Sequence, residues 1–584
     1  MKKINSRTVY GLIFLIISFA SCKKDSFLDR TPLSDLTEQN FFNDATDLNT
    51  YCNGLYSFLP TAYMALDDEQ SDNFENAPFN KVVAGQVVVP TVASQAGWET
   101  VAGSAGWNWS YLFQVNYFLQ NYQKAVADAA TKNHYAGVAR FFRAWFYFEK
   151  VKQYGDVPWY STTILPNDSA ALLKPRDPSQ LVMDSVIADL EFAAYNVNPT
   201  GPSGTITKWA ALALLARVAL HEGTFGEYRG SNTWQPLLQL ADSAATAVMQ
   251  SSQFQLYTTG NPAQDYSNLF LTYDPSNPQS SEIILGAFYS QTLFDTYPLD
   301  GYMTAYGHSL TKDLVNTYLM NTGTPFTAQP GYDTLMITSE FSNRDPRLAQ
   351  TVIGPGYTRL GAPYAPPLGA APTGYQQIKY YDPSTPSWNT NYNAALIFRY
   401  AEILLIHAEA KAELGTLTQA DLDMSVNLLR TRVGMPHLQI SAPIDPVLAA
   451  AYPNVGGTLQ NMILEIRRER RVELACEGFR YDDLMRWKSG ALLARPFLGM
   501  YFPGPGSYDL NGDGTVDVVL VTTATTASNQ KQIGVDIFLT NGNSGNVVPY
   551  PALVKAFSEN KNYYFPLPTT ELLLNTNLVQ NPGW

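Results

Sequence analysis

The sequence has few of the residues on which catalysis most often depends. Its 584 residues include only three cysteines and five histidines. No histidine lies in an HExxH spacing; the five are His134, His221, His308, His407 and His437. The chain also has no GxSxG elbow, no GxxxxGK[ST] phosphate loop and no GxGxxG after a predicted strand. These absences argue against the common hydrolase and nucleotide-binding classes, and we predict that the protein is not an enzyme.

Positive charge is also scarce. Lysine and arginine number 38 against 51 acidic residues, which gives a net charge of −13. No basic stripe is available to neutralise phosphates, so we expect no nucleic-acid partner. The one dense basic cluster, "RRERR" at 467–471, is interleaved with glutamates. The spacing of Glu465 with Arg468, and of Arg470 with Glu473, predicts a structural helix stabilised by its own salt bridges.

Long hydrophobic runs are absent except at the N-terminus, where an apolar stretch covers 9–20. It is shorter than the roughly 20 residues that a membrane-spanning helix needs, and basic residues precede it, so it predicts a signal peptide at 1–21. Small residues directly before Cys22 are typical of a bacterial lipoprotein signal, in which the cysteine becomes the lipidated first residue. The alternative is an ordinary cleaved signal with an incidental cysteine. We predict an exported protein anchored through Cys22.

The other two cysteines, Cys52 and Cys476, each lie in a helical pattern. A disulfide between them would be compatible with export, but two buried free thiols are the favoured interpretation.

Helical periodicity is abundant between residues 35 and 249. In 138–151, apolar residues recur at steps of three and four, and Gly155 then supplies a stop. Thr207 is a plausible N-cap for a helix over 207–222. A second helical block is predicted from about residue 394. It contains two amphipathic helices, the second starting with a Thr418–Asp421 capping box, which is what a tetratricopeptide-type hairpin requires.

Residues 250–390 and 490–560 have a different character. They are rich in Gly, Pro, Asn, Thr and Tyr, with short strand-like runs such as "SEIILGAFY" and "VDVVLVTT". Long irregular segments within a packed protein are usually functional, so we expect the binding surface here.

One stretch in the second of these segments has the spacing of a calcium loop. "DLNGDGTVD" places oxygen donors at loop positions 1, 3, 5, 7 and 9: Asp509, Asn511, Asp513, Thr515 and Asp517. Position 12 is Leu520 rather than a bidentate glutamate, so the loop is incomplete. Bound structural calcium and a plain turn rich in Asp and Asn are both open, and no other cofactor is predicted.

An acidic cluster, "LDDEQSD" at 66–72, raises the alternative of a glycoside hydrolase, which needs two carboxyl groups at a set separation. Such clusters more often mark a solvated turn, and we interpret this one in that way.

Several stretches, in order along the chain, resemble the SusD/RagB family of outer-membrane nutrient-binding lipoproteins. They are "CKKDSFLDRTPLSDLTEQNFF", "RFFRAWFYFEKVKQYGDVPW", "FRYAEILLIHAEAKAELG", "RRERRVELACEGFRYDDLMRW" and "YYFPLPTTELLLNTNLVQNPGW". We expect the charges in these motifs to be paired between packed helices rather than to touch ligand; they include Arg399, Glu402, Arg480 and Asp483.

The resemblance implies a mostly α-helical body with four tetratricopeptide-like helix pairs and an irregular, loop-rich binding region. It also implies an N-terminal region at 22–230 and a C-terminal region at 275–584, packed as one unit. Members of this family bind oligosaccharides, or in some lineages peptides, and form a lid on a SusC-like TonB-dependent β-barrel in the outer membrane. They are not enzymes. A role in polysaccharide utilization at the cell surface is therefore the leading hypothesis.

Sugar binding would use exposed aromatic rings flanked by polar groups. The candidate ligand contacts are loop aromatics and one carboxylate from the acidic cluster, and packing within the loops is the alternative for each ring: Trp98, Trp107, Tyr302, Tyr306, Trp388 and Asp72.

Overall fold

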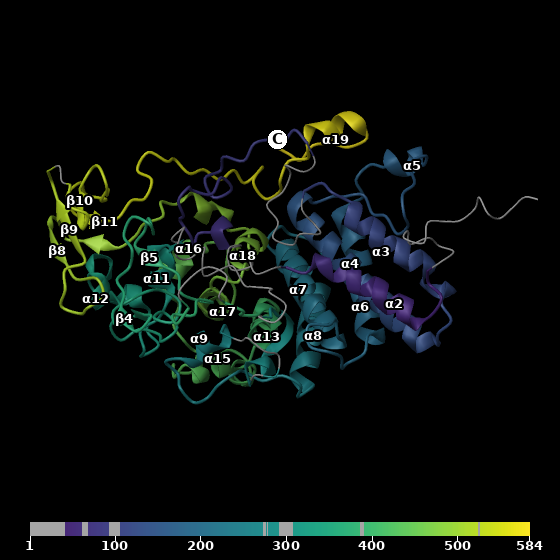
Figure 1. The fold of residues 1–584 in the computed structure, drawn as a ribbon, viewed down its shortest axis with the longest axis horizontal. Helices are drawn as coiled ribbons and strands as arrows, with labels where there is room; N and C mark the ends of the chain where they lie inside the picture. The colour runs from purple at the N-terminus through teal and green to yellow at the C-terminus, as the bar shows by residue number, and fades with distance from the viewer. Residues whose placement is uncertain are drawn as a thin grey trace, which may run out of the picture.

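The computed structural model describes residues 41–60, 68–92, 106–271, 276, 278–290, 308–385, 391–523 and 526–584. Helices fill one end and the middle of the molecule, and short strands and loops fill the other end (Figure 1). The predicted mostly helical class is confirmed, and residues 250–390 and 490–560 are loop-rich where described.

The N-terminal helices follow the predicted periodicity. Helix α4 ends where Gly155 adopts a φ of 69°, which a glycine accommodates without strain. The Thr207 side chain accepts a hydrogen bond from the Ala210 N–H and caps α7, as predicted. The helices of this part are α2 (Ala45–Leu55), α3 (Ser110–Asn121), α4 (Ala129–Tyr154), α5 (Ser169–Leu172), α6 (Ser179–Asn196), α7 (Lys208–Glu227) and α8 (Trp234–Gln250).

The C-terminal helices are shorter. The Thr418–Asp421 capping box is present at the start of α14. The helices are α9 (Asp265–Leu269), α11 (Lys312–Thr317), α12 (Ile337–Glu340), α13 (Tyr400–Glu413), α14 (Gln419–Asp423), α15 (Val426–Arg432), α16 (Pro446–Ala451), α17 (Gln460–Glu473), α18 (Arg480–Arg486) and α19 (Thr569–Leu574). Short 3-10 helices are η1 (Tyr56–Phe58), η5 (Tyr122–Lys124), η6 (Pro278–Ser281), η8 (Phe326–Ala328), η9 (Tyr332–Thr334) and η10 (Gly490–Ala494).

The second helical block begins later than predicted. Helix α13 starts at Tyr400, and the residues just before it, from Ala395, form strand β6 instead of the first turn of the helix. This strand pairs antiparallel with β1, and apart from Ala287 at the end of β1 the residues of both strands are buried. A short apolar run fits either a strand or a buried helix. Here the run forms a strand because β1, which is distant in sequence, pairs with it.

The strands are short and form small sheets. β1 and β9 confirm the two strand-like runs, and β10–β9–β8 form a three-stranded sheet in which β9 and β10 are parallel. The strands are β1 (Ile283–Ala287), β2 (Ser309–Leu310), β3 (Thr358–Arg359), β4 (Ala362–Pro363), β5 (Tyr375–Gln376), β6 (Ala395–Arg399), β7 (Tyr501–Phe502), β8 (Gly506–Tyr508), β9 (Val518–Val521), β10 (Gln530–Gln532) and β11 (Gly545–Asn546).

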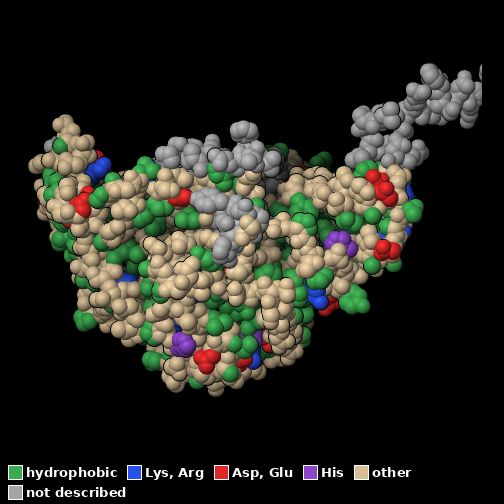
Figure 2. All heavy atoms as spheres, turned by 60° about the horizontal axis from the view of Figure 1, so that its bottom comes forward, with side chains coloured by type: hydrophobic (Ala, Val, Ile, Leu, Met, Phe, Trp, Pro, Cys, Tyr) green, Lys and Arg blue, Asp and Glu red, His purple; other side chains and the backbone are tan. Residues whose placement is uncertain are grey.

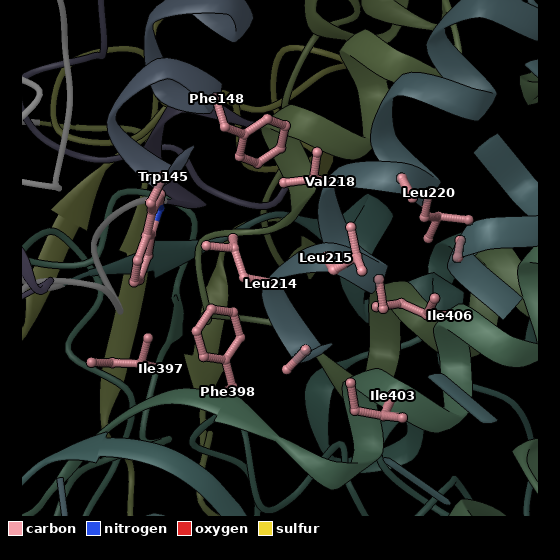
Figure 3. Packing of buried hydrophobic residues seen from close by; sticks show 14 of the residues in the cluster. Trp145, Phe148, Leu214, Leu215, Val218, Leu220, Ile397, Phe398, Ile403 and Ile406 are labelled. Carbon is pink, nitrogen blue, oxygen red and sulfur yellow. The ribbon is translucent and has the colours of Figure 1, made fainter. Parts of the chain in front are cut away.

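The helices pack as a continuous row. Helix α4 packs on α2, α3 and α6, and the row continues through α7, α8, α13 and α17 (Figure 1). This arrangement is compatible with tetratricopeptide-like pairs, whose number stays a prediction. One large core runs through the row and joins the two predicted regions: Trp145 of α4 meets Phe398 of β6 with ring centroids 5.4 Å apart (Figure 3). A second core lies under the loop-rich end, around α11, β5 and β7–β11.

Many charges lie inside the protein, whereas Figure 2 shows only scattered acidic and basic side chains on the face that it presents. The buried side chains are paired between elements. Arg399 contacts Glu282, Glu473 and Glu477 at 3.0, 2.8 and 2.7 Å, and Arg217 contacts Glu402 at 2.6 Å. These contacts, with Arg480–Asp72 and Arg470–Asp483, confirm the predicted role of the motif charges.

Helix α17, which carries "RRERR", differs in part from its prediction. The Glu465–Arg468 pair forms at 3.1 Å, but Arg470 pairs with Asp483 instead of Glu473. Glu473 contacts Arg347, Arg399 and Arg432 from other elements. Burial alone would raise the pKa of Glu473, but these three guanidinium groups hold it well below its ordinary range. The helix is thus stabilised mainly by partners that are distant in sequence.

The two described cysteines are free thiols and are buried, as predicted. Cys52 lies in α2, whereas Cys476 lies in the turn after α17 rather than in a helix. Within the described ranges, no helix has the length and apolar character needed to cross a membrane.

Candidate ligand-binding site

Most of the predicted ligand contacts cannot be placed. Trp98, Tyr302, Tyr306, Trp388 and the lipidation candidate Cys22 lie outside the described residues. Their roles stay predictions, and only two of the candidates, one aromatic and one acidic, have a described position.

Trp107 does not present its ring to a ligand. The residue is only 4% exposed, and its ring makes edge contacts with Trp109 and Tyr154 at centroid distances of 5.3 and 5.0 Å. The prediction for Trp107 was therefore wrong. A stretch rich in small residues precedes it, but its own side chain packs against α4.

Asp72 is also buried, and it is bound to arginines. Its carboxylate receives two hydrogen bonds from Arg480, at 2.6 and 2.8 Å, and lies 3.3 Å from Arg471. Such a bidentate pair leaves little capacity for ligand hydroxyls. Asp72 therefore holds the segment at 68–79 onto α17 and α18, which corrects its predicted role.

The acidic cluster at 66–72 is not a solvated turn where it is described. Asp68 is fully buried and accepts hydrogen bonds from the backbone N–H groups of Cys476 and Arg480, at 2.6 and 3.2 Å. Burial raises the pKa of Asp68 to about 6, although these hydrogen bonds lower it. Through these hydrogen bonds the cluster links two parts of the chain that are distant in sequence.

Glu69 lies against His308, with its Oε1 atom 3.3 Å from the histidine Nε2 atom. Burial raises the pKa of Glu69 to about 7 and lowers the pKa of His308 to about 4. Between these values both groups are mainly neutral, so the contact joins two uncharged partners.

We expect replacement of Glu69 by glutamine to become relatively more stabilising as the pH rises. The raised pKa means that the folded wild-type protein holds this proton from about pH 4.5 to 7, where the unfolded chain has lost it, so the stability that the proton contributes falls over this range and is lost by about pH 7. Glutamine stays neutral throughout. The melting temperature of Glu69→Gln minus that of the wild type should increase from pH 5 to pH 8, modestly because Glu69 is partly exposed. A constant difference would contradict this assignment.

A hollow of about 220 Å³ lies at the loop-rich end of the molecule. Its walls come from Ala77, from the loop at 368–372, from 531–538 at and after β10, and from 547–550 after β11. It therefore combines both segments in which the sequence predicts a binding surface. It is smaller than the 300–1,000 Å³ typical of pockets that enclose a drug-sized ligand, so it suits one ring or the end of a chain.

The hollow is mainly apolar and carries a few polar groups. Phe538 is 37% exposed, and Tyr550 is held by an edge contact with Phe79 and by a hydrogen bond from its hydroxyl to the Asn76 carbonyl. Lys531 and Asp536 supply one charge of each sign. Rings with polar groups beside them are what a sugar ring requires, because its C–H faces are apolar and its edge is covered with hydroxyls.

The loop at 509–517 holds its shape with its own hydrogen bonds. Asp509 accepts from the N–H groups of Gly512 and Gly514, and Asp517 accepts from that of Leu510 at 2.7 Å. Asp513 accepts from the Thr515 N–H, also at 2.7 Å. Over the described ranges, no three His, Cys, Asp or Glu residues are grouped so that they could hold a metal.

Calcium binding by this loop stays a prediction. A chelator should lower the melting temperature if an ion holds the loop, and should leave it unchanged if these hydrogen bonds suffice.

Comparison with known proteins identifies the family. A profile described as "SusD family" matches residues 254–584, more than half of the chain. This chain belongs to the SusD family. A second profile, described as "Starch-binding associating with outer membrane", matches residues 26–220.

Relatives in the SusD family match most of the chain. A SusD-like protein of Formosa agariphila is 24% identical over 519 residues, which cover 86% of this chain and 95% of that protein. A SusD-like protein of Bacteroides ovatus is 24% identical over 493 residues, 80% of each chain.

Solved structures show the same fold. A SusD-like protein of Bacteroides fragilis aligns with a TM-score of 0.68 and 22% identity, covering 95% of this chain and 100% of that one. A SusD-like carbohydrate-binding protein of the same species also gives 0.68, with 23% identity and coverages of 92% and 100%.

The residues of the hollow were not singled out by sequence reasoning. Phe538, Tyr550 and Lys531 lie in a stretch whose composition indicates a binding surface, but composition does not show which rings are exposed. In a SusD family member the scaffold motifs are recognisable from sequence, whereas the site depends on how loops from distant segments meet.

Proposed function

We propose that this protein is a non-catalytic, glycan-binding member of the SusD family that captures oligosaccharides or polysaccharide fragments at the cell surface. Family membership carries the proposal, together with the description of the matching N-terminal profile as starch-binding. A structural relative is named as carbohydrate-binding, and the hollow with Phe538 supplies an exposed ring beside polar groups.

The rest of the proposal concerns location and delivery. Lipidation at Cys22 would anchor the protein in the outer membrane, in keeping with the outer-membrane association in the profile description. A SusC-like TonB-dependent transporter would receive the captured glycan from this protein, which would cover the transporter as a lid. Co-purification of the full-length lipoprotein with such a β-barrel from outer membranes would test both points, with Cys22→Ser as the anchor-free control.

Binding without catalysis fits the chemistry of the hollow. Glycoside hydrolysis uses two carboxyl groups on either side of the bond that is cleaved. Among the residues that line the hollow, Asp536 is the single carboxylate. The nearby acidic cluster at 66–72 has Asp68 and Asp72 tied into the scaffold.

A glycan array followed by calorimetric titration with the best oligosaccharide tests the proposed function. We expect saturable binding and no new reducing ends after prolonged incubation with the same polysaccharide. New reducing ends would identify a lipid-anchored hydrolase instead. Binding of peptides, with no glycan bound, would favour the peptide-uptake alternative within the same machinery.

We expect Phe538→Ala to weaken glycan binding by roughly two- to tenfold, the effect of losing one aromatic face. The matched control is Phe113→Ala, which removes a phenylalanine that is 46% exposed on α3, outside the hollow. Calorimetry on both variants measures the difference. Equal affinities for wild type and Phe538→Ala, with Trp98→Ala reducing affinity, would place the site in the predicted N-terminal loop instead.

A further inference from the structure

A second cavity, of about 100 Å³, has a chemistry that the glycan hollow lacks. It lies between α11, η9, α16, α17 and η10, and it shares no lining residue with the hollow. Its most unusual feature is the number of guanidinium groups in its wall: Arg467, Arg468, Arg471, Arg480 and Arg495. The volume equals that of about three water molecules in the liquid, so the cavity has room for a small polyatomic ion.

Besides Arg467, three of these arginines have carboxylate partners. Arg480 and Arg471 share Asp72, and Arg471 also contacts Asp313 at 2.6 Å. Arg468 pairs with Asp445 and, at 3.1 Å, with Glu465. The charges of these three arginines and their carboxylate partners nearly cancel, so this part of the cavity wall is close to neutral. Asp313 is the one acidic side chain of the cavity lining that is strongly exposed, and its charge is offset by Arg471.

Arg467 has unused hydrogen-bonding capacity. Its side chain is fully buried and reaches a single carboxylate, Glu413, at 3.3 Å. Its Nε and Nη1 atoms are buried and have no hydrogen-bond partner, and neither does the Nε atom of Arg468. A buried donor without an acceptor is costly, and both arginines that carry these donors line the cavity.

Aromatic rings fix the Arg467 guanidinium in place. Its carbon lies 4.4 Å from the centroid of Trp487, 4.9 Å from that of Tyr228 and 5.1 Å from that of Tyr452. The fork of donors is therefore held rigid before any ligand arrives, which reduces the entropic cost of binding.

The carboxylate beside Arg467 is already shared. Both oxygens of Glu413 lie 2.9 Å from the Tyr228 hydroxyl, and Glu227 is close enough to interact electrostatically. Burial, and then the charge of Glu413, raise the pKa of Glu227 to about 8. Near neutral pH this group of one arginine and two carboxyls therefore carries little net negative charge to oppose an incoming anion.

Arg495 supplies a second available cation. It is exposed and lines the cavity, and within the described part of the chain no carboxylate lies within ion-pair distance of it. A ligand in the cavity could thus be held by the buried fork of Arg467 from inside and by Arg495 at the opening.

We propose that this cavity binds a small oxyanion: a sulfate, a phosphate or a carboxylate. Oxyanions accept two parallel hydrogen bonds from a guanidinium and form charge-assisted bonds, which are the strongest type available to these donors. The site adds an anion-recognition function to a protein whose proposed glycan site is elsewhere, and it does not depend on that proposal.

Titration of the purified mature protein with sodium sulfate at low ionic strength tests the proposal, with sodium chloride at matched ionic strength as the reference. We expect saturable binding, measured by calorimetry and by a rise in melting temperature. Methyl sulfate serves as a second probe. Binding of both probes points to an ester group on a larger ligand, and binding of sulfate alone points to the free ion.

Three variants locate the ion. Arg467→Lys keeps the charge but removes the donor fork, and should weaken sulfate binding by about tenfold or more. Arg495→Gln changes only an exposed side chain and should weaken sulfate binding several-fold. This variant tests the site even if Arg467→Lys, which changes a buried residue, folds poorly. Lys81→Gln removes an exposed charge outside the cavity and should have no effect. No binding beyond the chloride reference, or equal affinity in Arg495→Gln and Lys81→Gln, would overturn the proposal.

Discussion

Replacing Arg399 by methionine is expected to destabilise the fold by about 3–5 kcal/mol, the cost of breaking a buried ion pair on one side. Arg399 is 2% exposed and is the common partner of Glu282, Glu473 and Glu477. Methionine fills much of the same volume, so the loss is mainly electrostatic. The three carboxylates would remain buried with fewer positive neighbours, and the free energy of unfolding in denaturant should fall accordingly.

The matched control is Arg140→Met. Arg140 lies on α4, is 33% exposed and reaches Asp189 only at 3.5 Å, so we expect a loss of about 1 kcal/mol or less. If Arg399→Met cost no more than this control, the buried network would not be a main support of the fold.

The same network shows what sequence can and cannot predict. The spacing within α17 predicts a helix, and the one ion pair confined to a single turn, Glu465–Arg468, was found. The partners of Glu473 lie at positions 347, 399 and 432. Nothing in local spacing indicates them, because they become neighbours only after the helices pack. For that reason "RRERR" was correctly assigned to the scaffold, and one of its two predicted pairs formed, but the pairing of Arg470 with Glu473 was predicted wrongly.

The candidate ligand site, too, could be predicted from sequence only in part. Composition marked the two loop-rich segments, and both contribute walls to the hollow. The choice of aromatic residues was less successful, since Trp107 packs against Trp109 and Tyr154. Whether a loop ring faces solvent depends on its neighbours in space. Capping residues such as Thr207 and Thr418 could be predicted because a cap acts within four residues of itself.

Trp145→Ala should also have a large effect, about 3–5 kcal/mol, because it removes a large side chain that is 2% exposed. The ring contacts Phe58 and Phe141 within the N-terminal region. It also contacts Phe398 in the C-terminal region (Figure 3). Its Nε1 atom donates to Glu149 at 3.1 Å, so that the carboxylate would lose a partner as well. Tyr195→Ala, which removes an aromatic residue that is 88% exposed, is the control and should be nearly neutral.

The number of transitions in the denaturant unfolding curve is a further test of the contact between Trp145 and Phe398. Trp145 and Phe398 belong to one core, so the regions at 22–230 and 275–584 should unfold together, and Trp145→Ala should shift a single transition to lower denaturant. Two transitions in the wild type, with only the first shifted by the substitution, would show that the regions are separate units that merely touch. A single shifted transition would mean that the helical row supports the loop-rich end, and that losses of core packing far from the hollow reach this candidate site through global stability.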